Sequence, residues 1–236
     1  YISPDGALNL IPFAQLRTPD GQYLIERHNL RFVHSGRALK ERREQTQNRG
    51  LVAFGGIDFG TIEDNGTILA PHKTRGVLKT ASLASYGERA VDLARGALSG
   101  VQFSALPASR GEVDDIATYY GEQRGESTQV WKDNDAYERR VKTLAKPPRV
   151  AHFATHGFYL SAERETSRPL LLSGLTLAEA NKGIRGEMDS RGDDGVLFAI
   201  EASGLNLQET ELVVMSACDT AQGDIDYSEG VYGLGR

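Results

Sequence analysis

Continuous apolar runs alternate with segments of helical apolar spacing through most of the chain. Runs of strand length fall at 51–60, 127–131, 149–157 and 211–220. Between them, apolar side chains recur every third or fourth residue in two segments, which predicts helices. The first stripe comprises Val113, Ile116, Ala117 and Tyr120, and the second, capped by Asp133 or Asn134, comprises Tyr137, Val141, Leu144 and Ala145. Strands that alternate with helices predict a mostly parallel sheet with crossover connections.

The first 49 residues follow a different pattern. Pro-Asp-Gly occurs at 4–6 and again at 19–21, between short apolar runs. Proline presets one residue of a tight turn and glycine supplies the left-handed one, so these sequences predict short β-hairpins. Further along, helical spacing over 83–98 and a short apolar segment at 198–203 predict two more helices, and the acidic, glycine-rich residues 185–195 predict a solvated loop.

Two of the predicted strands end in reactive residues. The run at 149–157 (RVAHFATHG) leads into His156, and the run at 211–220 (ELVVMSACDT) leads into Cys218, the single cysteine of the chain. Ligands of open α/β sheets bind outside the carboxyl ends of the parallel strands, so both side chains are expected at one edge. A histidine beside a thiol can make it a nucleophile. Gly157, without a Cβ, lets its N–H approach a substrate carbonyl, and the Cys218 amide would be the second oxyanion donor.

Composition and charge limit the other classes of function. The 236 residues carry a net charge of −5 and contain no basic cluster interleaved with aromatic residues, so no nucleic-acid contact is predicted. No apolar stretch approaches the ~20 residues of a membrane span. A single cysteine fits a reducing compartment, and we predict a cytoplasmic location. With one cysteine and neither an HExxH nor a CxxC motif, we predict no metal site and no cofactor.

Structural explanations compete with the catalytic one. A lone cysteine is often a buried core residue, and a histidine at a strand end is often a core residue with satisfied hydrogen bonds. The residue pattern alone supports the catalytic and structural interpretations equally. His152, four residues before His156, is assigned to the sheet interior. A nucleotide-binding domain built on LVAFGG at 51–56 lacks the spacing of the known phosphate loops.

Several segments together resemble the CHAT domain family, which comprises caspase-like peptidases often attached to TPR repeats. They are HFATHGFYL, RPLLLSGLTLAEA, DDGVLFAIEASGLNLQETELVVMSACDTAQGD and EGVYGLGR, with SPDGALNLIPFAQL near the start. The resemblance spans nearly the whole chain apart from 61–98. It implies an α/β caspase-like sandwich with a mostly parallel central sheet flanked by helices and preceded by short N-terminal β-hairpins.

The resemblance also implies roles for single residues. His156 would be the general acid/base, Cys218 the nucleophile, and Gly157 and the Cys218 backbone the oxyanion hole. Ser216 matches a position that lines the specificity pocket of caspase relatives. Asp219 stands where caspases carry arginine, so a preference for aspartate is not expected. The implied function is that of an intracellular cysteine endopeptidase acting on a protein substrate; the alternative is a silent pseudo-protease that serves as a regulatory interaction module.

The resemblance divides the chain as follows. Residues 1–49 form an N-terminal β-rich segment of the same domain, and 50–236 form the catalytic core, with an insertion at 61–98. The family's sheet continues past EGVYGLGR, so we expect the core to be truncated at its C-terminus. The expected partners are the substrate, an upstream TPR or regulatory domain, and a chain that supplies the missing C-terminal segment.

Overall fold

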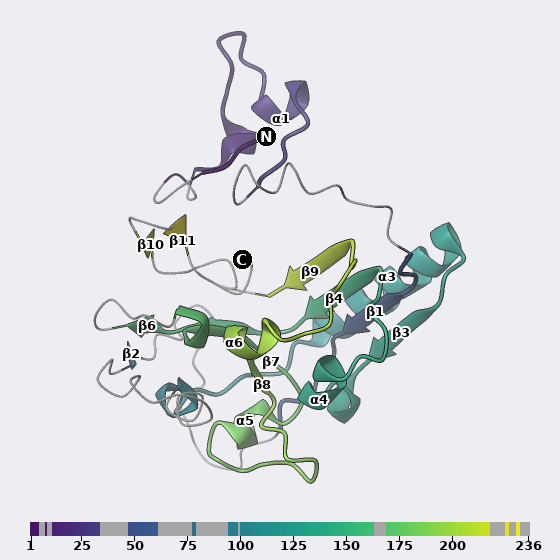
Figure 1. Ribbon diagram of the computed structural model, residues 1–236, viewed down its shortest axis with the longest axis vertical. Helices are drawn as coiled ribbons and strands as arrows, with labels where there is room; N and C mark the ends of the chain where they lie inside the picture. Colours follow the sequence, from purple (N-terminus) through teal and green to yellow (C-terminus); the bar gives the residue numbers. More distant parts are fainter. Residues whose placement is uncertain are drawn as a thin grey trace.

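A four-stranded parallel sheet in the order β3-β1-β4-β9 forms the centre of the molecule (Figure 1). Its strands are β1 (Leu51–Phe54), β3 (Thr128–Trp131), β4 (Val150–Ala154) and β9 (Leu212–Ser216), and every pairing is parallel. The computed structural model describes residues 1–4, 8, 11–33, 47–60, 77–78, 94–98, 100–162, 169–217, 225–226 and 230–231. Each strand lies within a predicted apolar run, so the parallel α/β class is confirmed.

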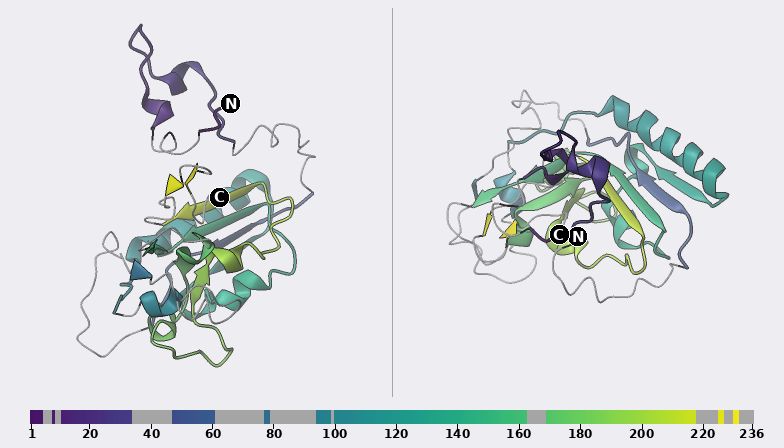
Figure 2. Two further views of the ribbon diagram at one scale, coloured as in Figure 1. Left: turned by 60° about the vertical axis from the view of Figure 1, so that its left-hand side comes forward. Right: turned by 90° about the horizontal axis from the view of Figure 1, so that it is seen from above.

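Both faces of β1 are covered, and all four of its residues are buried and apolar. Leu51 and Ala53 point to one face, where they pack with Val113 and Ala117 of helix α3 (Pro107–Arg124). Proline occupies the first turn of α3 and Gly125 ends it in the left-handed conformation, at φ +62°. Side chains alternate along a strand, so the neighbouring residues of β1 face the opposite layer. The right-hand panel of Figure 2 shows α3 running along the sheet.

The opposite layer contains a second, antiparallel sheet that the sequence did not predict. Its order is β5-β7-β8, with β5 at Gly157–Tyr159, β7 at Ser173–Thr176 and β8 at Val196–Phe198. Short helices α4 (Glu138–Lys142), α5 (Ala180–Gly183) and α6 (Ala199–Ala202) accompany it. Aromatic rings tie the layer together: Phe54 and Phe153 of the parallel sheet stack at 5.2 Å, and Phe158 meets Phe198 edge-on at 5.3 Å. The larger core cluster lies on this side.

The second predicted helix begins later and is shorter than expected. Asp133 has a left-handed φ of +50°, and its N–H donates to the Gly56 carbonyl at 3.1 Å. Its carboxylate pairs with Arg110 of α3. These contacts engage Asp133 in holding β1 and α3, so it starts only the 3-10 turn Asp133–Asp135, and α4 begins after Tyr137. The prediction of a cap at Asp133 or Asn134 was wrong for this reason.

The acidic loop at 185–195 has no regular structure and is mostly exposed, as predicted, but its last residues, 193–195, are buried. Asp193 and Asp194 are buried, and Asp194 forms an ion pair with Arg95. Asp194 Oδ1 also accepts from its own loop, from the Val196 N–H at 2.8 Å. The prediction of a solvated loop therefore fails only at 193–195, where the partly buried cation of Arg95, 99 positions before Asp194, offsets the cost of burying the carboxylate.

The described residues among the first 33 lie apart from the sheet, at the top of Figure 1. The turn at 19–21 is confirmed by an antiparallel bridge between Arg17 and Tyr23, and Ile2 bridges Phe32. The remaining small elements are the 3-10 turns Phe13–Gln15 and Pro169–Leu171, helix α1 (Leu24–Arg27), and the strand pairs β2 (Val77–Leu78) with β6 (Ser161–Ala162) and β10 (Ile225–Asp226) with β11 (Gly230–Val231).

Of the helix predicted over 83–98, only its last turn belongs to the described residues, and 94–97 are helical. The predicted division at residue 49, the insertion at 61–98 and the C-terminal truncation stay predictions. The described helices include none with the length and apolar character that a membrane crossing requires.

Candidate active site

The candidate site lies at the carboxyl edge of the parallel sheet, where β4 and β9 end side by side. The last paired residues are Ala154 and Ser216, directly opposite each other. His156 follows Ala154 by two residues, and Cys218 follows Ser216 by the same number in sequence. Ser216 is exposed at this edge. Cys218 and Asp219 lie outside the described residues.

His156 is buried in an aromatic setting just beyond β4. Its side chain is only 2% exposed, and its ring centroid lies 5.1 Å from Phe59 and 5.4 Å from Phe103. The polar contact of the imidazole runs from Nε2 to the backbone carbonyl of Ser104, at 2.7 Å. The ring is therefore held between the segment after β1 and the segment before α3.

The Ser104 carbonyl selects one tautomer of the imidazole. A carbonyl oxygen can only accept a hydrogen bond, so Nε2 must carry the proton and donate it. In the neutral ring, Nδ1 is then the unprotonated, basic nitrogen. Burial lowers the pKa of His156 from its usual 6.5, and the hydrogen bond to Ser104 opposes that shift in part. The arrangement favours a neutral imidazole whose basic atom is Nδ1.

Gly157 presents its N–H on the free side of β5. His156 and Thr176 form a hydrogen-bonded pair, with Thr176 N–H donating to the His156 carbonyl at 3.0 Å. Positions alternate along an antiparallel ladder, so Gly157, opposite Leu175, is a non-bonded position. Its N–H therefore points away from β7, and β5 is the outer strand of the three-stranded sheet as described.

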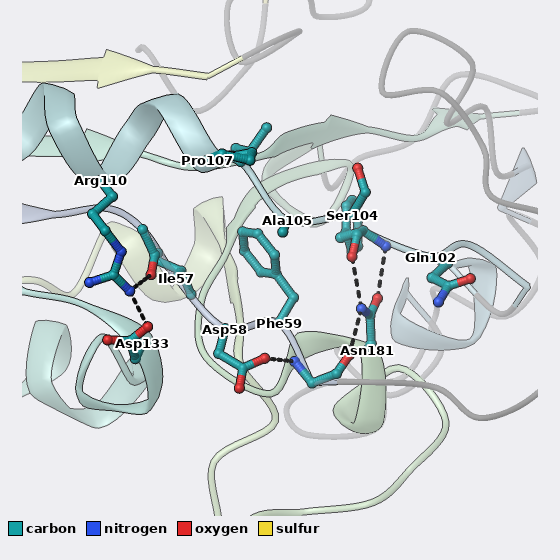
Figure 3. Close-up of a pocket in the computed structure, with 14 residues that line it drawn as sticks. Ile57, Asp58, Phe59, Gln102, Ser104, Ala105, Pro107, Arg110, Asp133 and Asn181 are labelled. Carbon is teal, nitrogen blue, oxygen red and sulfur yellow. Dashed lines mark hydrogen bonds and ion pairs between the residues drawn. The ribbon is translucent and has the colours of Figure 1, made fainter.

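Asn181 of α5 fixes the segment that carries Ser104. Its side chain is 2% exposed; Nδ2 donates to the carbonyls of Gly60, at 3.0 Å, and Phe103, at 2.9 Å. Its Oδ1 accepts from the Phe103 N–H at 2.8 Å. One buried amide thus joins the chain after β1 to the chain before α3 (Figure 3). Asn181 and Ser104 were not predicted from the sequence.

A pocket of about 420 Å³ opens beside this arrangement, at the carboxyl ends of β1 and β3. Its walls are the segment after β1, the segment before α3, and single residues from the turn after β3 and from α5 (Figure 3). Phe59, Phe103 and Ser104, which hold the His156 ring, all contribute to its lining. Ser216, predicted to line a substrate pocket, is not among the residues around this one.

Other candidate chemistry within the described ranges is limited. His152 is buried in β4, and its Nε2 lies 2.9 Å from Oε1 of Glu112 on α3, so its assignment to the sheet interior is confirmed. Over the same residues, no cluster of three or more histidine, cysteine, aspartate or glutamate side chains could hold a metal ion.

Comparison with known families agrees with this fold. A family model described as the CHAT domain matches residues 1–236, the whole chain. The chain belongs to the CHAT domain family. This family is related to the caspase-like cysteine proteases, and a parallel four-stranded sheet flanked by helices is consistent with a caspase-like fold. Searches of the curated proteins and of the solved structures gave no match.

Membership of the CHAT family confirms the resemblance seen in the sequence segments. The CHAT domain described here supplies a buried imidazole with a fixed tautomer, a backbone N–H directed away from its sheet, and an adjacent pocket.

Proposed function

We propose that this CHAT domain is a cysteine endopeptidase in which Cys218 is the nucleophile and His156 the general acid/base. The observation that carries the proposal is the register of β4 and β9. Ala154 lies opposite Ser216, so the two neighbouring parallel strands end at the same level, and each proposed catalytic residue follows its strand end by two positions in sequence. Neighbouring strands lie about 4.8 Å apart, a spacing that side chains can bridge.

The reaction follows from the tautomer of His156. Cys218 transfers its thiol proton to Nδ1, because Nε2 is already protonated and held by the Ser104 carbonyl. The thiolate adds to the carbonyl carbon of the substrate, and the N–H groups of Gly157 and Cys218 stabilise the oxyanion. When the C–N bond breaks, the proton on Nδ1 moves to the leaving amine.

A thioester then links the acyl half of the substrate to Cys218. Water attacks this thioester and gives a proton to Nδ1, the thiolate departs as the tetrahedral intermediate collapses, and the new carboxyl end is released. We further propose that Ser216 and Asp219, which flank Cys218 in sequence, contact the acyl half. The reduced thiol that this cycle needs fits a cytoplasmic location.

The experiment compares wild type with Cys218→Ala on a library of peptides derived from a proteome. We expect new N-termini with wild type and none above background with Cys218→Ala. The unfolding curve of Cys218→Ala should match that of wild type, which shows that the variant is folded. Cleavage that persists in Cys218→Ala would remove the thiol from the mechanism.

The alternative, a silent interaction module, gives a different result with an alkylating probe. An activated Cys218 should react with iodoacetamide at neutral pH faster than a free cysteine, and His156→Gln should slow it. Slow alkylation in wild type, together with no cleavage, would support the pseudo-protease instead.

A further inference from the structure

The pocket beside His156 has a defined place in the order of strands. Along the carboxyl edge, the sequence is β9, β4, β1, β3. Ser216 ends β9, His156 follows β4, and the pocket is built on Gly56–Gly60 after β1 and Asp133 after β3. The imidazole thus lies between the strand that precedes Cys218 and the pocket.

We propose that this pocket binds a lysine or arginine side chain of the substrate, on the leaving-amine side of the cleaved bond. The side follows from the chemistry of the proposed function, on which this inference rests. A general acid must reach the nitrogen that departs, so the leaving half of the substrate lies against the imidazole. The pocket lies beyond the imidazole as seen from β9, and the acyl half remains on the β9 side.

Strand spacing limits which substrate residue reaches the pocket. From β4 to β1 is about 4.8 Å, and from β4 to β3 about twice that distance. An extended peptide advances about 3.3 Å per residue, so this span corresponds to the first three residues after the cleaved bond. The pocket therefore selects at one of those three positions.

The charge of the pocket favours a cation. Its lining includes three charged side chains, Asp58, Arg110 and Asp133. Arg110 forms an ion pair with Asp133, which balances its positive charge, and it also donates to the Gly56 carbonyl at 3.4 Å. Asp58 uses Oδ1 to accept from the Gly60 N–H at 3.0 Å, and no described cation lies within ion-pair distance of it. The lining thus carries a net charge of −1.

Lys182, outside the lining, interacts electrostatically with Asp58, but its stronger interaction is the ion pair with Glu179, whose Oε2 lies 2.5 Å from Nζ. The apolar part of the pocket suits the rest of a long basic side chain. Ile57, Phe59 and Leu106 line it, and lysine and arginine bury their methylene stems on such surfaces while the charged head stays near a carboxylate.

Occupancy of the pocket would also act on His156. Phe59 and Phe103 contact the imidazole and also line the pocket, and the Ser104 carbonyl, in the same lining, accepts a hydrogen bond from Nε2. A bound side chain would press these residues toward the ring and hold it in place. Recognition of the leaving half and positioning of the general acid then share three residues.

The test reads the new N-termini made by the full chain from a proteome-derived peptide library. We expect lysine and arginine to be enriched at one of the first three positions. Asp58→Asn, which keeps the Oδ1 acceptor for Gly60, should reduce this enrichment about tenfold through loss of a charge-assisted contact. Asp115→Asn removes the same charge from an exposed position of α3 outside the pocket and should leave it unchanged.

Where wild type cleaves the library, three cleavage results would overturn the proposal: no basic enrichment, an enrichment that Asp58→Asn leaves intact, or an acidic enrichment that Arg110→Gln abolishes. A binding measurement separates this inference from the proposed function. Calorimetry with the Cys218→Ala variant compares the tripeptide amides Ala-Lys-Ala and Ala-Gln-Ala, whose free amine imitates the leaving group.

We expect the lysine peptide to bind about tenfold more tightly, with the difference lost in the double variant that adds Asp58→Asn. Equal binding of the two peptides would overturn the proposal, whatever the catalytic result. If wild type cleaves nothing and Cys218 is unreactive, yet the lysine peptide still binds in an Asp58-dependent manner, the endopeptidase proposal fails and the basic-side-chain site stands.

Discussion

Replacing Asn181 by alanine tests whether one buried amide holds the site together. The substitution removes three hydrogen bonds and leaves the N–H of Phe103 and the carbonyls of Phe103 and Gly60 without their partner. At about 1 kcal/mol for each bond, the free energy of unfolding should fall by about 3 kcal/mol. Folded domains of this kind have only about 5–15 kcal/mol in total, so the change is easily measured.

The same substitution should also change the pKa of His156. Asn181 fixes Phe103, and the carbonyl of the next residue, Ser104, accepts the hydrogen bond from Nε2 that raises the pKa of the imidazole against the effect of burial. If that carbonyl moves away, the pKa of His156 should fall further below 6.5. The assays are urea unfolding and an NMR titration of the imidazole.

Asn206→Ala is the matched control, because Asn206 is exposed and should change the stability by less than about 0.5 kcal/mol. A loss for Asn181→Ala no larger than that of the control, with the pKa of His156 unmoved, would refute the role assigned to Asn181.

Three further predictions concern pH and close packing. The pKa of His156 is lowered, so below pH 6.5 the unfolded chain binds more protons than the folded chain. The free energy of unfolding should therefore decrease as the pH falls below 6.5, and urea unfolding of His156→Gln should lack this decrease. Burial and the charge of Asp194 raise the pKa of Glu138 from 4.5 to about 8. The stability that protonated Glu138 contributes should therefore be lost as the pH rises between these values, and Glu138→Gln should make stability less dependent on pH in this range. Gly183→Ala would place a Cβ 1.8 Å from the Asp194 carbonyl oxygen and should cost about 3 kcal/mol or more, whereas Gly111→Ala in α3 meets nothing within 4 Å and should stabilise by about 0.5–1 kcal/mol; thermal unfolding compares the two.

The parallel sheet could be predicted because its strands are marked by dense apolar runs. Leu51 to Phe54 are buried on both faces, and such a run is typical of a covered parallel strand. The antiparallel sheet was missed because hydroxyl residues occupy its buried positions. Ser173 and Thr176 of β7 are both fully buried, and Thr176 uses its Oγ1 to donate to the His156 carbonyl at 3.3 Å. A sequence pattern that equates polar with exposed cannot recognise such a strand.

For the candidate site too, some residues could be predicted from the sequence and others could not. His156 and Gly157 were found because a reactive side chain and a glycine stand at the end of an apolar run. The Ser104 carbonyl has no sequence signature, since every residue carries one, and only the fold brings it within 2.7 Å of Nε2. Asn181 likewise belongs to no recognisable motif, and its hydrogen-bond partners lie 78 and 121 positions away in the sequence. The catalytic roles of His156 and Cys218 stay predictions.

The order of strands in the parallel sheet has a consequence for biosynthesis. β3, β1 and β4 are neighbours encoded between residues 51 and 154, whereas β9 joins beside β4 only from residue 212 onward. On a ribosome, the first three strands and α3 can pack before β9 is translated, because chains fold from the N-terminal side as they emerge. The imidazole is then in place while the strand that precedes the thiol is still unmade. The proposed nucleophile joins its partner late, so the nascent chain carries the imidazole without the thiol until Cys218 is translated.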